Sequence, residues 1–397
     1  MKYIFNFAAL VCLFAVSCGL AQGQGGAKRV RRQPVARGDF NRLAAQAAAA
    51  REAQQIDEAI TVYRQALRLR PGWDEGWWYL ATLLYDRDSY AEAARAFKET
   101  ARLRPKAGAP LAMLGLCEFQ LGAYDEALAH IRQGRQVGLI DNKELTRALR
   151  YHEGILLIIK GQFEQAEKTL GTLSAEGVGT ENLIIGLGLA ILRLPVLPRT
   201  ITPHSKDHDL VRRAGWAEHL MLLKNFADAQ IEYERLVTDY PKTPNVQYAY
   251  GRYQMAQRNE DAAVKAFERE IENSPKHAFA RLQIAYLRLN IKDPAAGLKY
   301  AEEAVKLYPN FPLGYYVLGR LLFDTGANDR AIEALETAGK LSPDDAKVYF
   351  ALARAYTRAK RKTDADRARE TFARLNQQAE NASQQSFGID ESPKGNP

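Results

Sequence analysis

The chain has 397 residues, of which 47% are hydrophobic and 26% charged, with 28 glycines and 16 prolines. This composition excludes a disordered, a collagen-like and a disulfide-stapled chain, and the length exceeds what one hydrophobic core usually supports. The formal net charge is +8, but residues 22–38 hold five basic residues and no acidic one, so the rest of the chain is only mildly basic. Because phosphate binding needs a concentrated Lys/Arg face, this distribution argues against nucleic acid as a partner.

Residues 1–21 have the pattern of a secretory signal peptide. Lys2 precedes an apolar run from Tyr3 to Val16 that only Asn6 interrupts, and small residues then lead to Ala21. A charged start, a short apolar centre and small residues at the exit mark such a leader. We therefore expect export to the periplasm or the exterior and a mature chain that begins at Gln22. The basic residues within 22–39 predict a disordered linker.

The leader also allows a lipid anchor. Ala15-Val16-Ser17-Cys18 resembles a permissive lipobox, in which Cys18 would be lipidated and become the first residue. Ala15 and Ser17 stand where such a motif usually has Leu and Gly or Ala. The mature protein is thus either soluble or an outer-membrane lipoprotein, and it contacts a membrane only if Cys18 is lipidated. In the soluble form Cys117 is the only cysteine, so no intrachain disulfide can form.

Beyond the leader the sequence repeats with a period of 34 residues. Proline recurs at this interval at Pro71 and Pro105, and again at Pro241, Pro275, Pro309 and Pro343. Small residues recur in the same register at Ala59, Ala93 and Ala127, and at Ala229, Ala263, Gly297, Ala331 and Ala365. The apolar spacing between these marks is helical, so each unit is predicted to be a pair of antiparallel helices joined by a short turn.

The residues at these places resemble the tetratricopeptide repeat. Residues 74–107 carry the pattern Trp77, Leu80-Ala81, Tyr90, Ala93, Phe97 and Pro105, and residues 312–345 carry Tyr315, Leu318-Gly319, Gly326, Ala331, Ala338 and Pro343. The small residues let the two helix axes approach, and proline ends the second helix. The resemblance implies an all-α, right-handed superhelical solenoid of antiparallel helix pairs, of exported bacterial type.

Nine units are predicted in two arrays, with about four repeats in residues 40–180 and about five in 210–379. Residues 181–209 interrupt them with one apolar helix and a proline-rich segment, which forms either a joint between two halves or a degenerate repeat packed with its neighbours. Pro294 and Gly297 are expected to shorten or distort the second helix of the seventh unit. Residues 380–397, rich in Gln, Ser, Asn and Gly, predict a disordered tail.

Motifs of catalysis are scarce. The sequence has no P-loop, no dinucleotide fingerprint and no Gly-x-Ser-x-Gly elbow. One candidate metal set combines His204, His208 and His219 with Asp207 and Asp209, although Pro203 and the loop-like composition argue against a helical ligand spacing. We therefore predict no enzyme activity, no metal and no cofactor. A metal-dependent hydrolase that uses residues 195–209 remains the less favoured alternative.

Other reactive side chains have structural explanations. Cys117 is expected in the core. Paired carboxylates are expected in the first turns of helices, where the helix dipole favours negative charge. These pairs are Asp57-Glu58, Asp125-Glu126, Glu302-Glu303 and Asp344-Asp345.

The remaining candidate site is a groove. In stacked helix pairs the first helices line the concave side, and an interleaving of Tyr, Phe and Arg is typical of protein-binding surfaces. The places where a carboxylate clamp would have Asn hold Arg252, Tyr286, Arg320 and Arg354, so we expect an acidic or extended peptide bound through arginine rather than a chaperone tail. The predicted groove residues are Tyr248, Arg252, Phe279, Leu282, Tyr286, Tyr316, Arg320, Phe323, Phe350 and Arg354, with Met255, Leu289 and Arg358 beside them.

The sequence thus predicts a non-catalytic scaffold of the cell envelope that binds a partner protein or peptide in the concave groove of a repeat solenoid. The alternative is an envelope assembly factor that is anchored by lipid at Cys18.

Overall fold

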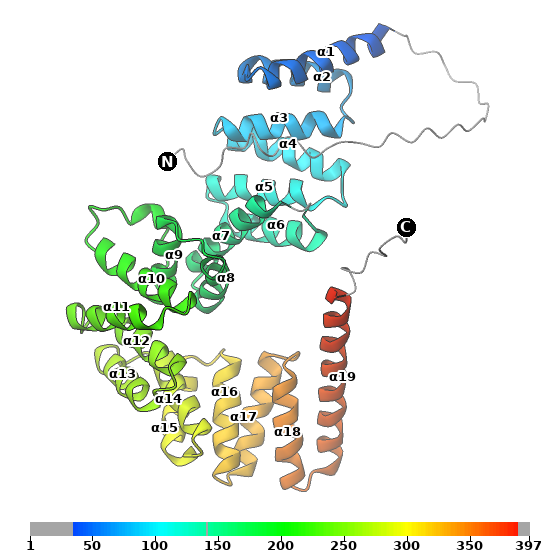
Figure 1. The fold of residues 1–397 in the computed structure, drawn as a ribbon. Coiled ribbons are helices and arrows are strands. Elements are labelled where there is room, and N and C mark those ends of the chain that lie inside the picture. The colour runs from blue at the N-terminus through cyan, green and yellow to red at the C-terminus, as the bar shows by residue number, and fades with distance from the viewer. Residues whose placement is uncertain (1–34, 140–141, 388–397) are drawn as a thin grey trace, which may run out of the picture. The chain divides into compact units, whose positions relative to one another are not determined.

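A computed structural model describes residues 35–139 and 142–387. Within these ranges the chain forms nineteen α-helices and one short 3-10 helix, and it contains no strand (Figure 1). The predicted leader, the lipobox with Cys18 and the start of the basic linker lie outside the described residues. Among those residues, no helix combines the length and apolar character needed to cross a membrane.

The chain divides into two compact units. The first comprises Met1–Val178 with Pro195–Pro198, and the second comprises Gly179–Leu194 with Arg199–Pro397. In the first unit four antiparallel pairs follow one another along the chain. They are α1 (Val35–Glu52) with α2 (Ile56–Leu69), α3 (Asp74–Asp86) with α4 (Tyr90–Leu103), α5 (Gly108–Leu121) with α6 (Tyr124–Val137), and α7 (Lys143–Ile159) with α8 (Phe163–Ala175).

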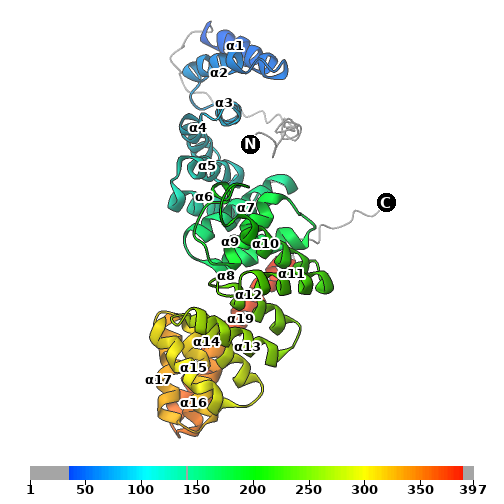
Figure 2. The ribbon, with the colours of Figure 1, turned by 90° about the vertical axis from the view of Figure 1, so that its left-hand side faces the viewer.

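The second unit begins with α9 (Glu181–Ile191), and the short helix η2 (Pro198–Thr200) follows in the connecting segment. Five pairs then stack in order, and both views show α14 to α17 side by side (Figures 1 and 2). They are α10 (His208–Leu222) with α11 (Phe226–Asp239), α12 (Val246–Ala256) with α13 (Glu260–Asn273), α14 (Ala278–Asn290) with α15 (Pro294–Leu307), α16 (Pro312–Asp324) with α17 (Asn328–Leu341), and α18 (Ala346–Arg358) with α19 (Lys362–Phe387).

A small residue in the first helix of each pair sets how closely the two helices approach. In several repeats this residue is glycine, and the side chain 16 positions later in the second helix packs directly on it. A Cβ atom would lie 2.6 Å from Leu335 Cγ at Gly319, and 2.5 Å from Phe267 Cε1 at Gly251. Side chains do not tolerate such distances, so a larger residue would force the helices apart.

The apolar helix α9 belongs to the second unit and packs against α10. All residues from Leu183 to Ile191 are buried. A Cβ at Gly188 would lie 1.9 Å from the carbonyl oxygen of Val211, and one at Gly215 would lie 1.8 Å from that of Ile184. Backbone meets backbone at this crossing, so α9 acts as a packed layer of the unit that begins at Gly179. Whether residues 181–209 form a joint or a degenerate repeat stays a prediction.

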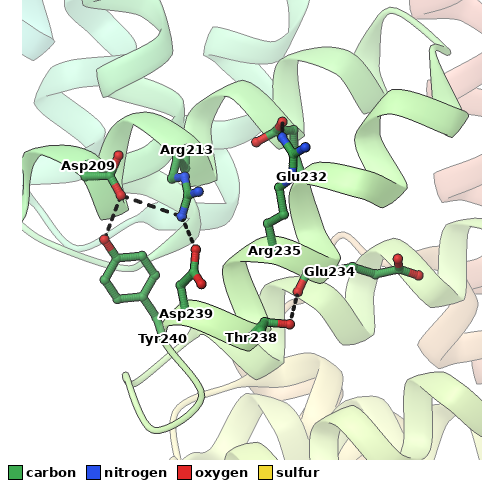
Figure 3. Close-up of polar contacts among 8 residues, drawn as sticks. All are labelled: Asp209, Arg213, Glu232, Glu234, Arg235, Thr238, Asp239 and Tyr240. Atoms are coloured by element: carbon green, nitrogen blue, oxygen red, sulfur yellow. Dashed lines mark hydrogen bonds and ion pairs between the residues drawn. The ribbon is translucent and has the colours of Figure 1, made fainter.

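A polar cluster joins the start of α10 to the end of α11 (Figure 3). Arg213 Nη1 donates to Asp239 Oδ2 at 2.6 Å and lies 3.6 Å from Asp209 Oδ2. The hydroxyl of Tyr240 donates to the same Asp209 oxygen at 2.7 Å. The hydrogen bond with Asp239 raises the pKa of Arg213, and the bond to Asp209 raises the pKa of Tyr240. Asp209 therefore helps to hold α10 against the end of α11.

Three sequence predictions about helix ends are wrong. The second helix of the seventh unit is regular, because Pro294 occupies the first turn of α15, where its missing N–H is not needed, and Asp293 caps that turn by accepting from the Ala296 N–H. Helix α1 begins at Val35, inside the predicted linker 22–39. Helix α19 continues to Phe387, inside the predicted tail 380–397. Gln377 stands where the preceding repeat has Pro343, so no helix-breaking residue ends α19 at the repeat boundary.

Two acidic pairs were predicted in first turns and do not lie there. Asp344 and Asp345 precede α18, and Asp345 caps this helix by accepting from the Lys347 N–H at 3.0 Å. Glu302 and Glu303 lie near the end of α15. They are paired there with cations, since Glu302 accepts from Arg330 at 2.6 Å and Glu303 from Arg281 at 2.7 Å. Ion pairs between neighbouring helices explain these two carboxylates.

The α9–α10 crossing yields a stability prediction. Gly188→Ala should lower the free energy of unfolding of the second unit by about 2 kcal/mol or more, because the backbone of Val211 cannot yield to the added methyl group. Urea denaturation followed by circular dichroism measures the effect. Gly339→Ala is the matched control, since its Cβ would meet only ordinary contacts at 3.7 Å or more, and it should be neutral or stabilise by up to about 1 kcal/mol. Equal effects of the two changes would contradict the backbone contact.

Candidate functional site

The first helices of the last three repeats form one continuous surface. Helix α14 contacts α16, and α16 contacts α18, in addition to the contacts each makes with the second helix of its own pair. Residues in the same register of these helices therefore follow one another across the unit. We call the surface made by Tyr286, Tyr316, Arg320, Phe323, Phe350, Arg354 and Arg358 the C-terminal groove.

Aromatic side chains are accessible along this groove. Tyr286 on α14 is 39% exposed and Phe350 on α18 is 49% exposed, whereas Tyr316 on α16 is half-buried. Next to Tyr316, the Nη1 atom of Arg320 donates to the tyrosine hydroxyl at 3.1 Å. The Nε–H of Arg320 is buried and has no hydrogen-bond partner among the described residues. An unmade bond of a buried charged group is costly, so this position of Arg320 carries an energetic cost in the free protein.

Two arginines cover the ring of Phe323. The guanidinium carbon of Arg358 lies 3.6 Å from the ring centroid and that of Arg354 lies 5.1 Å from it. Arg358 also donates to the carbonyl oxygen of Phe323 at 2.6 Å. Within the described part of the chain, no carboxylate forms an ion pair with Arg320, Arg354 or Arg358. Stacking on aromatic rings holds these guanidinium groups in place while leaving their edges open to an anion.

The groove ends in a cavity of about 560 Å³, which we call the end pocket. It is lined by Phe323, Phe350, Ala353, Arg354, Thr357, Arg358, Arg369 and Phe372. The rings of Phe350 and Phe372 lie 5.4 Å apart. Arg369 donates to Asp366 at 2.6 Å and to Thr357 Oγ1 at 2.8 Å. The pocket thus combines an apolar floor with a rim of three guanidinium groups, of which only one has a carboxylate partner.

Sequence reasoning missed Thr357, Arg369 and Phe372. The last two lie on α19, a second helix, which the groove prediction did not consider. The 34-residue register carries a signal that could have found them. At the places of Arg369 and Phe372, the preceding repeat has the buried residues Leu335 and Ala338.

Three predicted groove residues are buried: Tyr248, Leu282 and Phe323. Phe323 lies beneath Arg354 and Arg358 and lines the end pocket. Tyr248 and Leu282 pack inside the repeats, so their prediction as groove residues is wrong. Tyr248 packs 5.7 Å from the ring of Phe267 and 4.8 Å from that of His277, which begins the next repeat. Leu282 lies in the core formed by the following helix pairs. The next repeat covers both positions, whereas no described repeat follows Phe350, which has the same register.

Two further predicted residues lie away from the C-terminal groove. Phe279 is half-buried beneath the guanidinium group of Arg193, which lies 4.0 Å from its ring centroid, and it packs against Tyr308 and Phe311. Arg252 on α12 is half-buried. Phe279 thus contributes to packing between repeats, and the accessible part of the predicted groove begins at Tyr286.

The candidate metal set is not assembled. His204 is exposed, His208 begins α10 at 4.0 Å from Glu181, and His219 is buried beside the ring of Trp216. No group of three or more His, Cys, Asp or Glu residues suited to a metal ion occurs in the described ranges. Burial raises the pKa of the Cys117 thiol to about 12, so this side chain is a core residue and a poor nucleophile.

Antiparallel helix pairs in a 34-residue register, stacked with their first helices in contact, define a helical-repeat solenoid. Residues 44–108, 80–136 and 215–278 match the tetratricopeptide repeat family, and residues 319–359 match a second family described as TPR repeat. The chain is an all-α tetratricopeptide-repeat protein.

A curated relative supports the same family. The chain is 22% identical over 306 residues to the TPR repeat-containing protein MJ1428 of Methanocaldococcus jannaschii, and the match covers 76% of this chain. The chain spans about half the length of that relative, since the match covers 50% of it.

Solved structures with similar folds include MamA from Desulfovibrio magneticus RS-1, which is 21% identical with a TM-score of 0.38, covering 42% of this chain and 93% of MamA. The Cut9–Hcn1 complex of the APC/C is 14% identical with a TM-score of 0.38, covering 85% of this chain and 87% of that one. YrrB, described as a TPR protein with an unusual peptide-binding site, is 15% identical with a TM-score of 0.38. That match covers 43% of this chain and 88% of YrrB.

The unpaired arginines predict a characteristic salt dependence of stability. Arg354 and Arg358 are like charges one helical turn apart, so their repulsion destabilises α18. Arg354→Gln removes this repulsion, which salt screens. The change that it causes in the free energy of unfolding should therefore be more favourable at low salt than at high salt, by about 0.3 kcal/mol. Arg361→Gln should show the opposite sign, because Arg361 pairs with Asp364 and Glu336. Chemical denaturation of both variants at two salt concentrations tests this, and the same sign for both would contradict it.

Proposed function

We propose that this protein is a non-catalytic scaffold that binds an extended, acidic segment of a partner protein in the C-terminal groove. The observation that carries the proposal is the row of arginines on the first helices, stacked on aromatic rings and without carboxylate partners in the described part of the chain. Tyr and Arg, together with Trp, are enriched among the residues that dominate binding energy at protein interfaces.

The arrangement of charges favours an acidic partner. A guanidinium group offers a planar fork of donors that matches a carboxylate, and such pairs are strongest when the arginine is already held in place. Arg320 and Arg354 occupy the same register in consecutive repeats, so a peptide crossing α16 and α18 would meet a guanidinium group on each helix. The exposed rings of Tyr286 and Phe350 offer apolar contact beside them.

Loss of the middle of the groove tests this function. Tyr286→Ala with Arg320→Ala should reduce capture of partner proteins from cell-envelope extract by at least tenfold at equal helicity, because one aromatic and one arginine contact each contribute one to several kcal/mol at an interface. Bound proteins are compared by mass spectrometry with those captured by the unmodified chain.

A matched control sits on a second helix. Phe226→Ala with Arg235→Ala removes one exposed aromatic residue and one exposed arginine from α11, and it should leave capture unchanged. Equal capture by the groove variant and the unmodified chain would exclude the groove as the working surface.

We further propose that the protein acts in the cell envelope, as a soluble exported scaffold or as a lipid-anchored assembly factor. The leader pattern of residues 1–21 supports export, and Cys18 supports the anchored form. The intact mass of the protein from the envelope fraction should correspond to a chain that begins at Gln22 or at lipidated Cys18. A mass that retains residues 1–17 would contradict both forms.

A further inference from the structure

The end pocket lies where the repeat pattern stops. Each second helix in the preceding repeats carries two buried residues at the places of Arg369 and Phe372. Arg369 corresponds to Leu335, Ala301, Phe267 and Tyr233, and Phe372 corresponds to Ala338, Ala304, Glu270 and Leu236; all eight are buried. Phe350 is more exposed than its counterparts, since Tyr248 and Leu282 are buried and Tyr316 is half-buried.

The first helix of the next repeat covers this surface elsewhere in the unit. A Cβ at Gly339, next to Ala338 on α17, would lie 3.7 Å from Val348 and 4.0 Å from Leu352, both on α18. No described helix occupies the corresponding place beyond α18 and α19. At this end Phe350 is 49% exposed and the side chain of Arg369 is 54% exposed. The uncovered surface is shaped to receive a helix.

The described chain does not return to cover this end. The preceding second helices end before Pro309 and Pro343, whereas α19 runs straight through the equivalent position, Gln377, to Phe387. Phe387 is 15 residues beyond Phe372, about 22 Å along the helix. The described chain thus leaves the end pocket open.

The charge of the pocket selects among occupants from other molecules. Its rim carries Arg354, Arg358 and Arg369 against one carboxylate, Asp366. Helix α1 of a second copy has more arginines than acidic residues in its sequence, so it does not complement this rim. A complementary helix must present apolar side chains to Phe350 and Phe372 and carboxylates to the arginines beside them.

We infer that the end pocket docks an amphipathic helix of a partner protein, whose apolar stripe is flanked by Asp or Glu, in the place where a further first helix would lie. This surface goes beyond the groove proposed above. It shares Phe350, Arg354 and Arg358 with the groove, and adds Arg369 and Phe372 from α19.

A pair of designed helical peptides tests the inference. Both carry leucines at positions i, i+3, i+4 and i+7; one has Glu on both flanks and the other has Lys. Fluorescence anisotropy with the full chain should show binding of the acidic helix at least tenfold tighter than that of the basic helix. Failure to bind the acidic helix, or equal binding of both, overturns the inference.

Variants locate the binding. Phe372→Ala restores the residue found in the two preceding repeats, at Ala338 and Ala304, so it should fold normally, and it should weaken binding of the acidic helix at least tenfold. Arg354→Glu with Arg358→Glu should reverse the preference in favour of the basic helix. Unchanged binding by either variant overturns the inference.

Two controls separate this surface from other possibilities. The groove variant Tyr286→Ala with Arg320→Ala should bind the acidic helix normally, so the groove and the end pocket can fail independently. A peptide of residues 387–397 tests the tail of a second copy as occupant. It should not compete with the acidic helix, and competition at equal concentration would replace the partner helix by self-association.

Discussion

The close approach of the two helices in each repeat is the contact on which the rest of the structure depends. A glycine or alanine in the first helix accepts the side chain 16 positions later in the second, as Gly319 accepts Leu335 and Gly154 accepts Leu170. This contact fixes the crossing of the pair and therefore the direction of the free face of the first helix. Because the repeat is 34 residues long, the same face recurs from pair to pair. A groove of regularly spaced side chains follows from packing alone, before any ligand is considered.

Whether a given position of the repeat is buried depends on whether another repeat packs against it. Leu282 is buried and Phe350 is half-exposed, although both stand at the same place in their repeats. Leu335 is a core residue, whereas Arg369 in the same register is charged and faces the end pocket. A position released from the need to be apolar can carry binding chemistry. This explains why arginine and aromatic residues gather at the end of the second unit, where packing no longer dictates the side chain.

The sequence predicted the helix pairs well because proline, small residues and helical apolar spacing mark them independently. The prediction of helix ends was weaker where one residue type is compatible with two structures. Proline breaks a helix in its interior but is accommodated in the first turn, and Pro294 is of the second kind. Glycine is not required at the turn between helices, since Asp88 and Lys292 adopt φ values of 58° and 60° there. The exposure of groove residues could not be predicted from register alone, because the burial of Tyr248 depends on His277, 29 residues away in the next repeat.

Several arginines of the described chain are held by carboxylates. Arg132 and Arg135 share the buried carboxylate of Glu153, and Arg281 binds Glu303. The same means were available at α18, where Arg361 in the turn that follows is paired with Asp364. Arg354 and Arg358 instead repel each other across one turn and rest on a phenylalanine ring. Folding gains nothing from that repulsion, but an incoming carboxylate would relieve it. The electrostatic cost to the free protein and the attraction for an acidic partner thus have one cause, and the stacked ring of Phe323 keeps both guanidinium groups ready for it.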